Sequence, residues 1–166
     1  MVKGSNSGKV LVTVSLISSV FWFQVKGDGN CLFMALRAGL EGDFLYREYH
    51  IRWMAVMGLV LYRSHLYPLV KEGIRANYGL KRIFGAPPGL EGPLSYKSYC
   101  RNMCVNGFWG DEPALMSLAM TWGVRISVVN SVTLTVTRIL HSSSLSESDL
   151  VVVHNDRNHY CAAGEL

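Results

Sequence analysis

The chain contains 166 residues, of which 49% are hydrophobic and 17% are charged, so it can bury one sizeable core and is too short for two ordinary domains. Its formal net charge is +4, but the basic residues are scattered singly or in pairs such as Lys81-Arg82, which argues against direct nucleic-acid binding. The four cysteines are too widely spaced for a dense disulfide framework, and this favours a reducing compartment, the cytoplasm.

The N-terminal residues predict a leader followed by strands. We expect residues 1–8 to be a flexible leader that is not part of the fold, and residues 9–166 to form one domain. The apolar stretch Val10 to Phe23 follows lysines as a signal peptide would, but it contains several hydroxyl residues and lacks a clear cleavage site. It is also too short and too polar for a membrane span. Alternation of apolar and polar residues predicts two strands instead, one on either side of Ser18-Ser19.

A glycine-rich turn that ends in a cysteine comes next, in the stretch Gly27-Asp28-Gly29-Asn30-Cys31-Leu32-Phe33. Apolar residues at 32, 35, 36 and 40 predict a helix that begins at or near Cys31. The positive end of a helix favours a thiolate, and the N–H groups of its first turn can bind an oxyanion. Cys31 is therefore the candidate nucleophile, and the alternative is a buried structural thiol.

The middle of the chain predicts scaffold helices. A helical stripe of apolar residues lies within residues 46–62, and a second helix is expected over residues 67–78 after Pro68. Residues 85–93 carry three of the five prolines and three glycines, so a loop is expected there.

Two further helices have recognisable ends. Ser95 can cap a helix that runs through Tyr99 and Met103, and a helix over residues 111–121 would be closed by Gly123.

The last third of the chain predicts strands at residues 124–130, 134–140 and 150–154, with a serine-rich loop over residues 141–148. Strands at both ends of the chain with helices between them indicate an α+β fold, a mixed α/β sandwich in which helices flank a small sheet. A helix start and a strand end then place the cysteine and a late histidine on one rim of that sheet.

His159 is the candidate base. It follows a polar loop that interrupts an apolar strand, and Tyr160 comes directly after it. A histidine held at a strand edge can take a proton from a thiol that a distant helix supplies. For His154, five residues earlier, a structural role is the preferred interpretation.

Four segments together resemble the ovarian-tumour (OTU) family of cysteine proteases. They are the cysteine turn, Tyr99-Cys100-Arg101-Asn102-Met103, Gly107-Phe108-Trp109-Gly110-Asp111-Glu112, and a terminal strand ending in His159-Tyr160. The resemblance runs from about Phe23 to Tyr160 and keeps the order D-G-N-C-L-F, Y-x-x-x-M, W-G-D-E, H-Y. It implies a papain-like architecture and a thiol protease, free of cofactor or metal, that cleaves after the C-terminal Gly-Gly of ubiquitin or ubiquitin-like modifiers.

The resemblance also implies roles for three residues. Cys31 would be the nucleophile, His159 the base and then the acid, and Asp28 a supporting residue that orients His159 or shapes the oxyanion loop. Many relatives carry Asp or Asn two residues after the histidine, where it fixes the ring. Cys161 occupies that position here, so Asp28, Asp156, Asn158 or a backbone carbonyl would serve, or the enzyme works as a dyad.

Two other motifs have structural interpretations. Trp109 is expected to anchor the core and Asp111 to cap the following helix. A zinc site of Cys100, Cys104, His159 and Cys161 is a weak alternative, because the first two lie on a predicted amphipathic helix rather than on turns.

Three functions are compatible with the whole pattern. The first is a deubiquitinase acting on ubiquitin conjugates, the second a viral protease that cuts its own polyprotein, and the third a catalytically idle ubiquitin-binding domain. A monomer in the cytoplasm is expected, and in the host cytoplasm if the protein is viral.

Overall fold

A computed structural model describes residues 10–14, 17–40, 47–72, 95–133, 135–139, 149–155 and 159–165. The leader expected at residues 1–8 and the loops expected at 85–93 and 141–148 lie outside the described residues. The same holds for Asp156 and Asn158.

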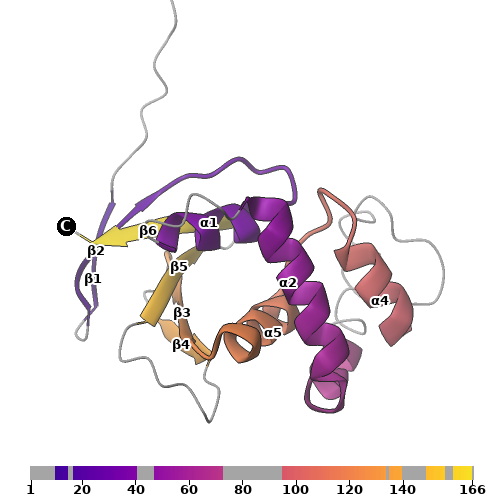
Figure 1. The fold of residues 1–166 in the computed structure, drawn as a ribbon. Coiled ribbons are helices and arrows are strands. Elements are labelled where there is room, and N and C mark those ends of the chain that lie inside the picture. The colour runs from indigo at the N-terminus through magenta and orange to yellow at the C-terminus, as the bar shows by residue number, and fades with distance from the viewer. Residues whose placement is uncertain are drawn as a thin grey trace, which may run out of the picture.

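Six strands in the described residues form one sheet in the order β1-β2-β6-β5-β3-β4 (Figure 1). They are β1 (Val10–Val14), β2 (Ile17–Phe23), β3 (Arg125–Asn130), β4 (Val136–Ile139), β5 (Asp149–Asn155) and β6 (His159–Glu165). β3 and β5 are parallel, and every other neighbouring pair is antiparallel. The C-terminal strand β6 therefore lies inside the sheet, between β2 and β5.

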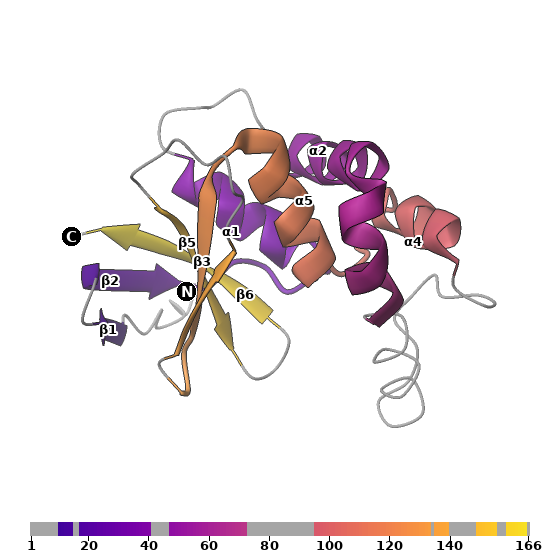
Figure 2. The same ribbon diagram turned by 90° about the horizontal axis from the view of Figure 1, so that it is seen from below.

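The helices are α1 (Cys31–Gly39), α2 (Glu48–Leu61), α4 (Tyr96–Met103) and α5 (Glu112–Trp122), and residues 63–72 are also helical. Figure 2 shows the helices gathered on one side of the sheet. α1 packs on β5 and β6, α5 packs on β3 and β4, and α2 lies over α1 and α5. No helix among the described residues is both long and apolar enough to cross a membrane.

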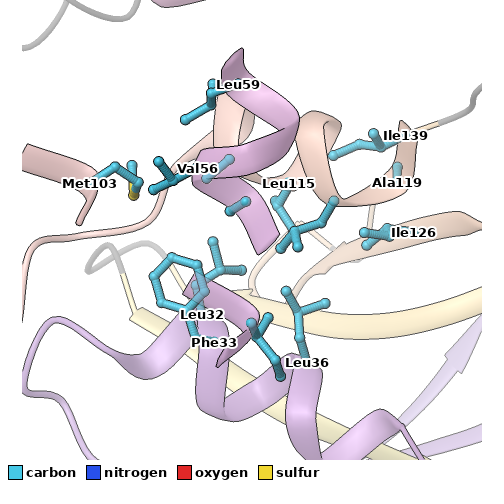
Figure 3. Close-up of a cluster of buried hydrophobic side chains, with 14 of the residues drawn as sticks. Leu32, Phe33, Leu36, Val56, Leu59, Met103, Leu115, Ala119, Ile126 and Ile139 are labelled. Carbon is cyan, nitrogen blue, oxygen red and sulfur yellow. The ribbon is translucent and has the colours of Figure 1, made fainter. Parts of the chain in front are cut away.

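The core lies between these helices and the sheet. Figure 3 shows how it is assembled from Leu32, Phe33 and Leu36 of α1, with side chains of α2, α5 and the strands above them. Phe33 and Leu36 are fully buried, and each contributes about 2–3 kcal/mol by leaving water. Since α1 begins at Cys31, this burial fixes the start of the helix relative to the sheet.

The mixed fold with helices flanking a sheet is confirmed, and so are three helix ends. The Ser95 side chain accepts the Ser98 N–H, and the Asp111 side chain accepts the Ala114 N–H. Gly123 ends α5 at a positive φ of 65°, which favours glycine.

Three expectations about element boundaries are wrong. Ser18-Ser19 does not separate two strands but lies within β2, because Ile17 and Val20 on either side of it both pair with β1. The second middle helix begins at residue 63, before Pro68 rather than after it, because Leu66 and Val70 turn toward the core from one face of that helix. The terminal strand begins at His159 instead of ending there, because residues 159–165 pair with both β5 and β2.

Candidate active site

The turn before Cys31 depends on glycine at residue 29. Gly29 has a φ of 84°, and a Cβ atom on it would lie 1.7 Å from the carbonyl oxygen of Gly107. Both the backbone angle and the contact exclude any other residue without a rearrangement. The turn is thereby pressed against the loop that precedes the W-G-D-E segment.

Asn30 precedes the first residue of α1 but does not cap the helix. Its Oδ1 atom accepts hydrogen bonds from the Arg52 guanidinium at 2.6 Å and from the Gly107 N–H at 3.2 Å. Because the side chain is used there, the N–H groups of the first turn of α1 keep their capacity to bind an anion.

Cys31 begins α1 and is 7% exposed. All four cysteines are free thiols. A negative charge on Cys31 favours the protonated forms of Arg52 on α2 and of Tyr160 and Cys161 on β6, so these three side chains lie close to the thiol. The cysteine therefore lies at a helix start that faces the strand of the candidate base.

His159 is half-buried at the first position of β6. A Cβ atom built on Gly27 would lie 3.6 Å from both Cε1 and Nδ1 of the His159 ring. The His159 N–H donates to Oδ1 of Asn155, its partner across the β5–β6 pair, at 3.0 Å. The structure thus brings the histidine to the turn that begins four residues before Cys31.

The Asp28 carboxylate is used within the turn. Its Oδ1 accepts the Asn30 N–H at 3.1 Å, and its Oδ2 lies 3.3 Å from the Lys26 ammonium. Partial desolvation raises the pKa of Asp28, but the Asn30 N–H and the Lys26 charge outweigh it, so the pKa lies below the ordinary value. These contacts fit a role in shaping the turn better than a role in orienting His159.

Cys161 shares a face of β6 with His159, since the two residues are two positions apart on a strand. It is fully buried, in a cluster with Val129 and Val153. Burial, together with the charge of Cys31, raises the pKa of the Cys161 thiol to about 11. The thiol is therefore neutral near pH 7 and a poor partner for an imidazolium.

The expectation that Trp109 anchors the core is wrong. Trp109 is 48% exposed, while Phe108 is 9% exposed and belongs to the core. A Cβ atom on Gly110 would lie 2.5 Å from Leu32 Cδ2, so the backbone itself fills the space next to α1. The indole consequently points outward.

Asp111 caps α5 as expected and has a second partner. The Tyr99 hydroxyl of α4 donates to its carboxylate, so the Y-x-x-x-M and W-G-D-E segments meet here. Desolvation raises the pKa of Asp111 to about 6, against the hydrogen bonds from Tyr99 and Ala114.

The cysteines of the zinc alternative do not form a ligand set. Cys104 donates from its thiol to the Cys100 carbonyl within the α4 turn. Among the described residues, no group of three or more His, Cys, Asp or Glu side chains is arranged to hold a metal ion.

Sequence reasoning missed Arg52 and Asn155. Arg52 is 2% exposed and lies on the same helix face as the buried residues Ala55, Val56 and Leu59. A charged residue within an apolar stripe at helical spacing was the signal that could have identified it. The signal for Asn155 was local as well, since an asparagine four residues before His159 can accept its backbone N–H.

The chain is similar to proteins of one family. The family model described as "OTU-like cysteine protease" matches residues 26–160. An OVARIAN TUMOR DOMAIN-containing deubiquitinating enzyme 9 of Arabidopsis thaliana is 32% identical over 112 residues, which cover 65% of this chain and 25% of that enzyme. The chain spans between 24% and 35% of the length of the curated relatives that it matches.

Solved structures share the fold. The viral OTU domain protease from Farallon virus matches with a TM-score of 0.63 and 21% identity, covering 100% of this chain and 96% of that one. An OTU domain in complex with ubiquitin matches with a TM-score of 0.57 and 15% identity, covering 97% of this chain and 78% of that one.

Proposed function

We propose that this chain, which belongs to the OTU-like cysteine protease family, is a thiol-dependent deubiquitinase that hydrolyses isopeptide and peptide bonds after the C-terminal Gly-Gly of ubiquitin. The observation that carries the proposal is the position of the His159 ring next to Gly27, in the turn that leads to Cys31, where a Cβ atom on Gly27 would lie 3.6 Å from the ring. This position supports Cys31 as nucleophile and His159 as base acting on one substrate carbonyl, although 128 positions (159 minus 31) separate the two residues in the sequence.

The proposed reaction is acyl transfer through a thioester. Cys31 attacks the carbonyl carbon of the terminal glycine, and His159 takes the thiol proton. Since the Asn30 N–H is engaged by Asp28, the Cys31 N–H at the start of α1 is the donor best placed for the oxyanion. His159 then protonates the leaving amine, and a water molecule, deprotonated by His159, releases ubiquitin from Cys31.

Asp28 acts in this proposal as the residue that shapes the oxyanion turn. Its hydrogen bond to the Asn30 N–H and the Asn30 contacts to Arg52 and Gly107 support that role. Asn155 is assigned the placement of the His159 backbone at the start of β6, since its Oδ1 accepts the His159 N–H.

The location and substrate range complete the proposal. Four free thiols support a reducing compartment, the cytoplasm, and a monomer is sufficient because one chain supplies Cys31, His159 and Asn155. Ubiquitin-like modifiers that end in Gly-Gly are proposed as further substrates, since a tail without side chains can enter a site too narrow for bulkier residues.

The test is cleavage of ubiquitin that carries a fluorogenic amide at its C-terminus, with a fluorogenic Gly-Gly peptide beside it. We expect turnover of the ubiquitin substrate and none by Cys31→Ala. Binding of ubiquitin without turnover, and without labelling of Cys31 by an electrophilic ubiquitin probe, would favour an idle ubiquitin-binding domain. Cleavage of the chain's own flanking sequences, with no action on ubiquitin, would favour polyprotein processing.

A further inference from the structure

Arg52 is a buried cation in the centre of the candidate site. Its guanidinium is 2% exposed and donates hydrogen bonds to the carbonyls of Gly29 at 3.2 Å, Met103 at 3.1 Å and Phe108 at 2.8 Å, and to Oδ1 of Asn30 at 2.6 Å. One side chain of α2 thus holds the nucleophile turn on one side and residues 103–108 on the other.

Every hydrogen-bond partner of this guanidinium among the described residues is neutral. The Cζ atom of the group also lies over the Phe33 ring, 4.2 Å from its centre. Desolvation lowers the pKa of Arg52 to about 10, although the charges of Asp28, Cys104 and Cys31 oppose this. Burying a cation without a bonded carboxylate is unfavourable, and an apolar side chain of similar size would fill the volume at lower cost. Packing alone therefore does not account for an arginine here.

The two segments that Arg52 joins are also in direct contact. Gly29 lies against the Gly107 carbonyl, and Asn30 Oδ1 accepts from Arg52 and the Gly107 N–H together. Met103 and Phe108 are themselves buried in the core. Through Arg52, the turn before Cys31 is held at a set distance from the core.

Position matters most for the oxyanion donor. An N–H group stabilises a developing oxyanion only when it lies about 2.7–3.1 Å from it, and a misplacement of about 1 Å costs on the order of 100-fold in rate. The Cys31 N–H follows directly after Gly29 and Asn30, whose carbonyl and side chain Arg52 holds.

We propose that Arg52 is a positioning residue for acyl transfer, which holds the Gly29 carbonyl and the Asn30 side chain so that the Cys31 N–H faces the oxyanion. This inference rests on the proposed function. Arg52 would then affect the stabilisation of the tetrahedral intermediate and not the reactivity of the Cys31 thiol.

Arg52→Lys is the decisive variant, because lysine keeps the charge and loses the planar fork that reaches four acceptors. Turnover of the fluorogenic ubiquitin substrate needs the oxyanion donor, whereas alkylation of Cys31 by iodoacetamide, located by mass spectrometry, does not. We expect kcat to fall about 100-fold with KM and the alkylation rate within about threefold of wild type. Arg52→Met, which also loses the charge, should lower both rates.

Two controls separate this effect from general destabilisation. Ser117→Ala removes a buried hydrogen bond from α5 to the Ala55 carbonyl on α2, and Arg37→Met removes an exposed arginine paired with Glu48. Both should keep kcat within about threefold. Unchanged turnover in Arg52→Lys, or alkylation that falls in step with turnover, would overturn the proposal.

If Arg52→Lys does not fold, Asn30→Ala takes its place, since the guanidinium then keeps its three carbonyl partners. Turnover by Asn30→Ala should fall while the rate of Cys31 alkylation stays near that of wild type. A wild-type chain without turnover would refute the proposed function alone. Hydrogen exchange still tests Arg52 in that case: Arg52→Lys should speed amide exchange at residues 27–31 and 103–108 but not in α5. If Arg52→Lys changed amide exchange at residues 27–31 and 103–108 no more than it changed exchange in α5, the positioning role would be refuted.

Discussion

The His159 ring lies next to Gly27, with Cε1 and Nδ1 both 3.6 Å from the place where a Cβ atom would lie. A methyl group at this distance makes an ordinary van der Waals contact. A branched side chain would not fit there without moving the ring. The residue at position 27 therefore limits where the imidazole can lie relative to Cys31.

We predict that Gly27→Ala keeps kcat within about threefold of wild type, whereas Gly27→Val lowers it by at least about tenfold, since a misplaced base loses much of its effect. Steady-state cleavage of the fluorogenic ubiquitin substrate measures both. Equal activities in the two variants would show that the ring does not depend on this contact.

Cys31→Ala should abolish turnover and leave the fold intact, because a side chain with 7% exposure loses little packing when one sulfur atom is removed. Ubiquitin binding should persist, as calorimetry can measure. Cys100→Ala, on α4, and Cys104→Ala, directly after α4, serve as matched controls and should remain active. Activity of Cys31→Ala near the wild-type level would disprove the assignment.

His159→Ala should lower kcat by several orders of magnitude, because it removes the base and the acid of the reaction together. His154→Ala should change kcat by less than about threefold. The His154 ring packs against the Tyr160 ring in a tilted arrangement with the ring centres 4.8 Å apart, which gives it a packing role. The comparison is well matched, since both histidines are half-buried residues of the β5–β6 pair. A larger loss for His154→Ala would reverse the assignment.

Asp28 is expected to act through the turn and not through its charge. Asp28→Asn keeps an acceptor for the Asn30 N–H and should retain most activity, while Asp28→Ala should lose about 10- to 100-fold. Lys26→Met removes only the exposed ion pair and should be silent. If Asp28→Asn is as impaired as Asp28→Ala, the carboxylate charge is required, as it would be for orienting His159.

Asp111 should make the stability of the fold depend on pH. Desolvation raises its pKa to about 6 in the folded chain, above the value of 3.8 for an exposed carboxyl, so the folded state binds this proton more tightly than the unfolded state. Its contribution is present in full below about pH 4 and is lost as the pH rises through about 6. Urea unfolding of wild type and Asp111→Asn from pH 4 to 7 should show a difference in unfolding free energy that shrinks by on the order of 2 kcal/mol. A difference that grows over this range would contradict the assignment.

Local sequence patterns determined the element types and several of their ends. The Ser95 and Asp111 caps, the Gly123 stop and the start of α1 at Cys31 each depend on residues only a few positions apart. The motif around Cys31 and the H-Y pair were equally visible in the sequence, and with W-G-D-E they were sufficient to indicate the family that the match over residues 26–160 then showed.

Tertiary structure alone decided which residues surround the nucleophile. Arg52 reaches the Gly29 turn from another helix, Asn30 accepts from the N–H of Gly107, and Trp109 is exposed while Gly110 lies against Leu32. Helical period and turn chemistry describe the backbone over a few residues. Contacts between segments that lie far apart in the chain depend on how whole elements pack, and no local pattern encodes them.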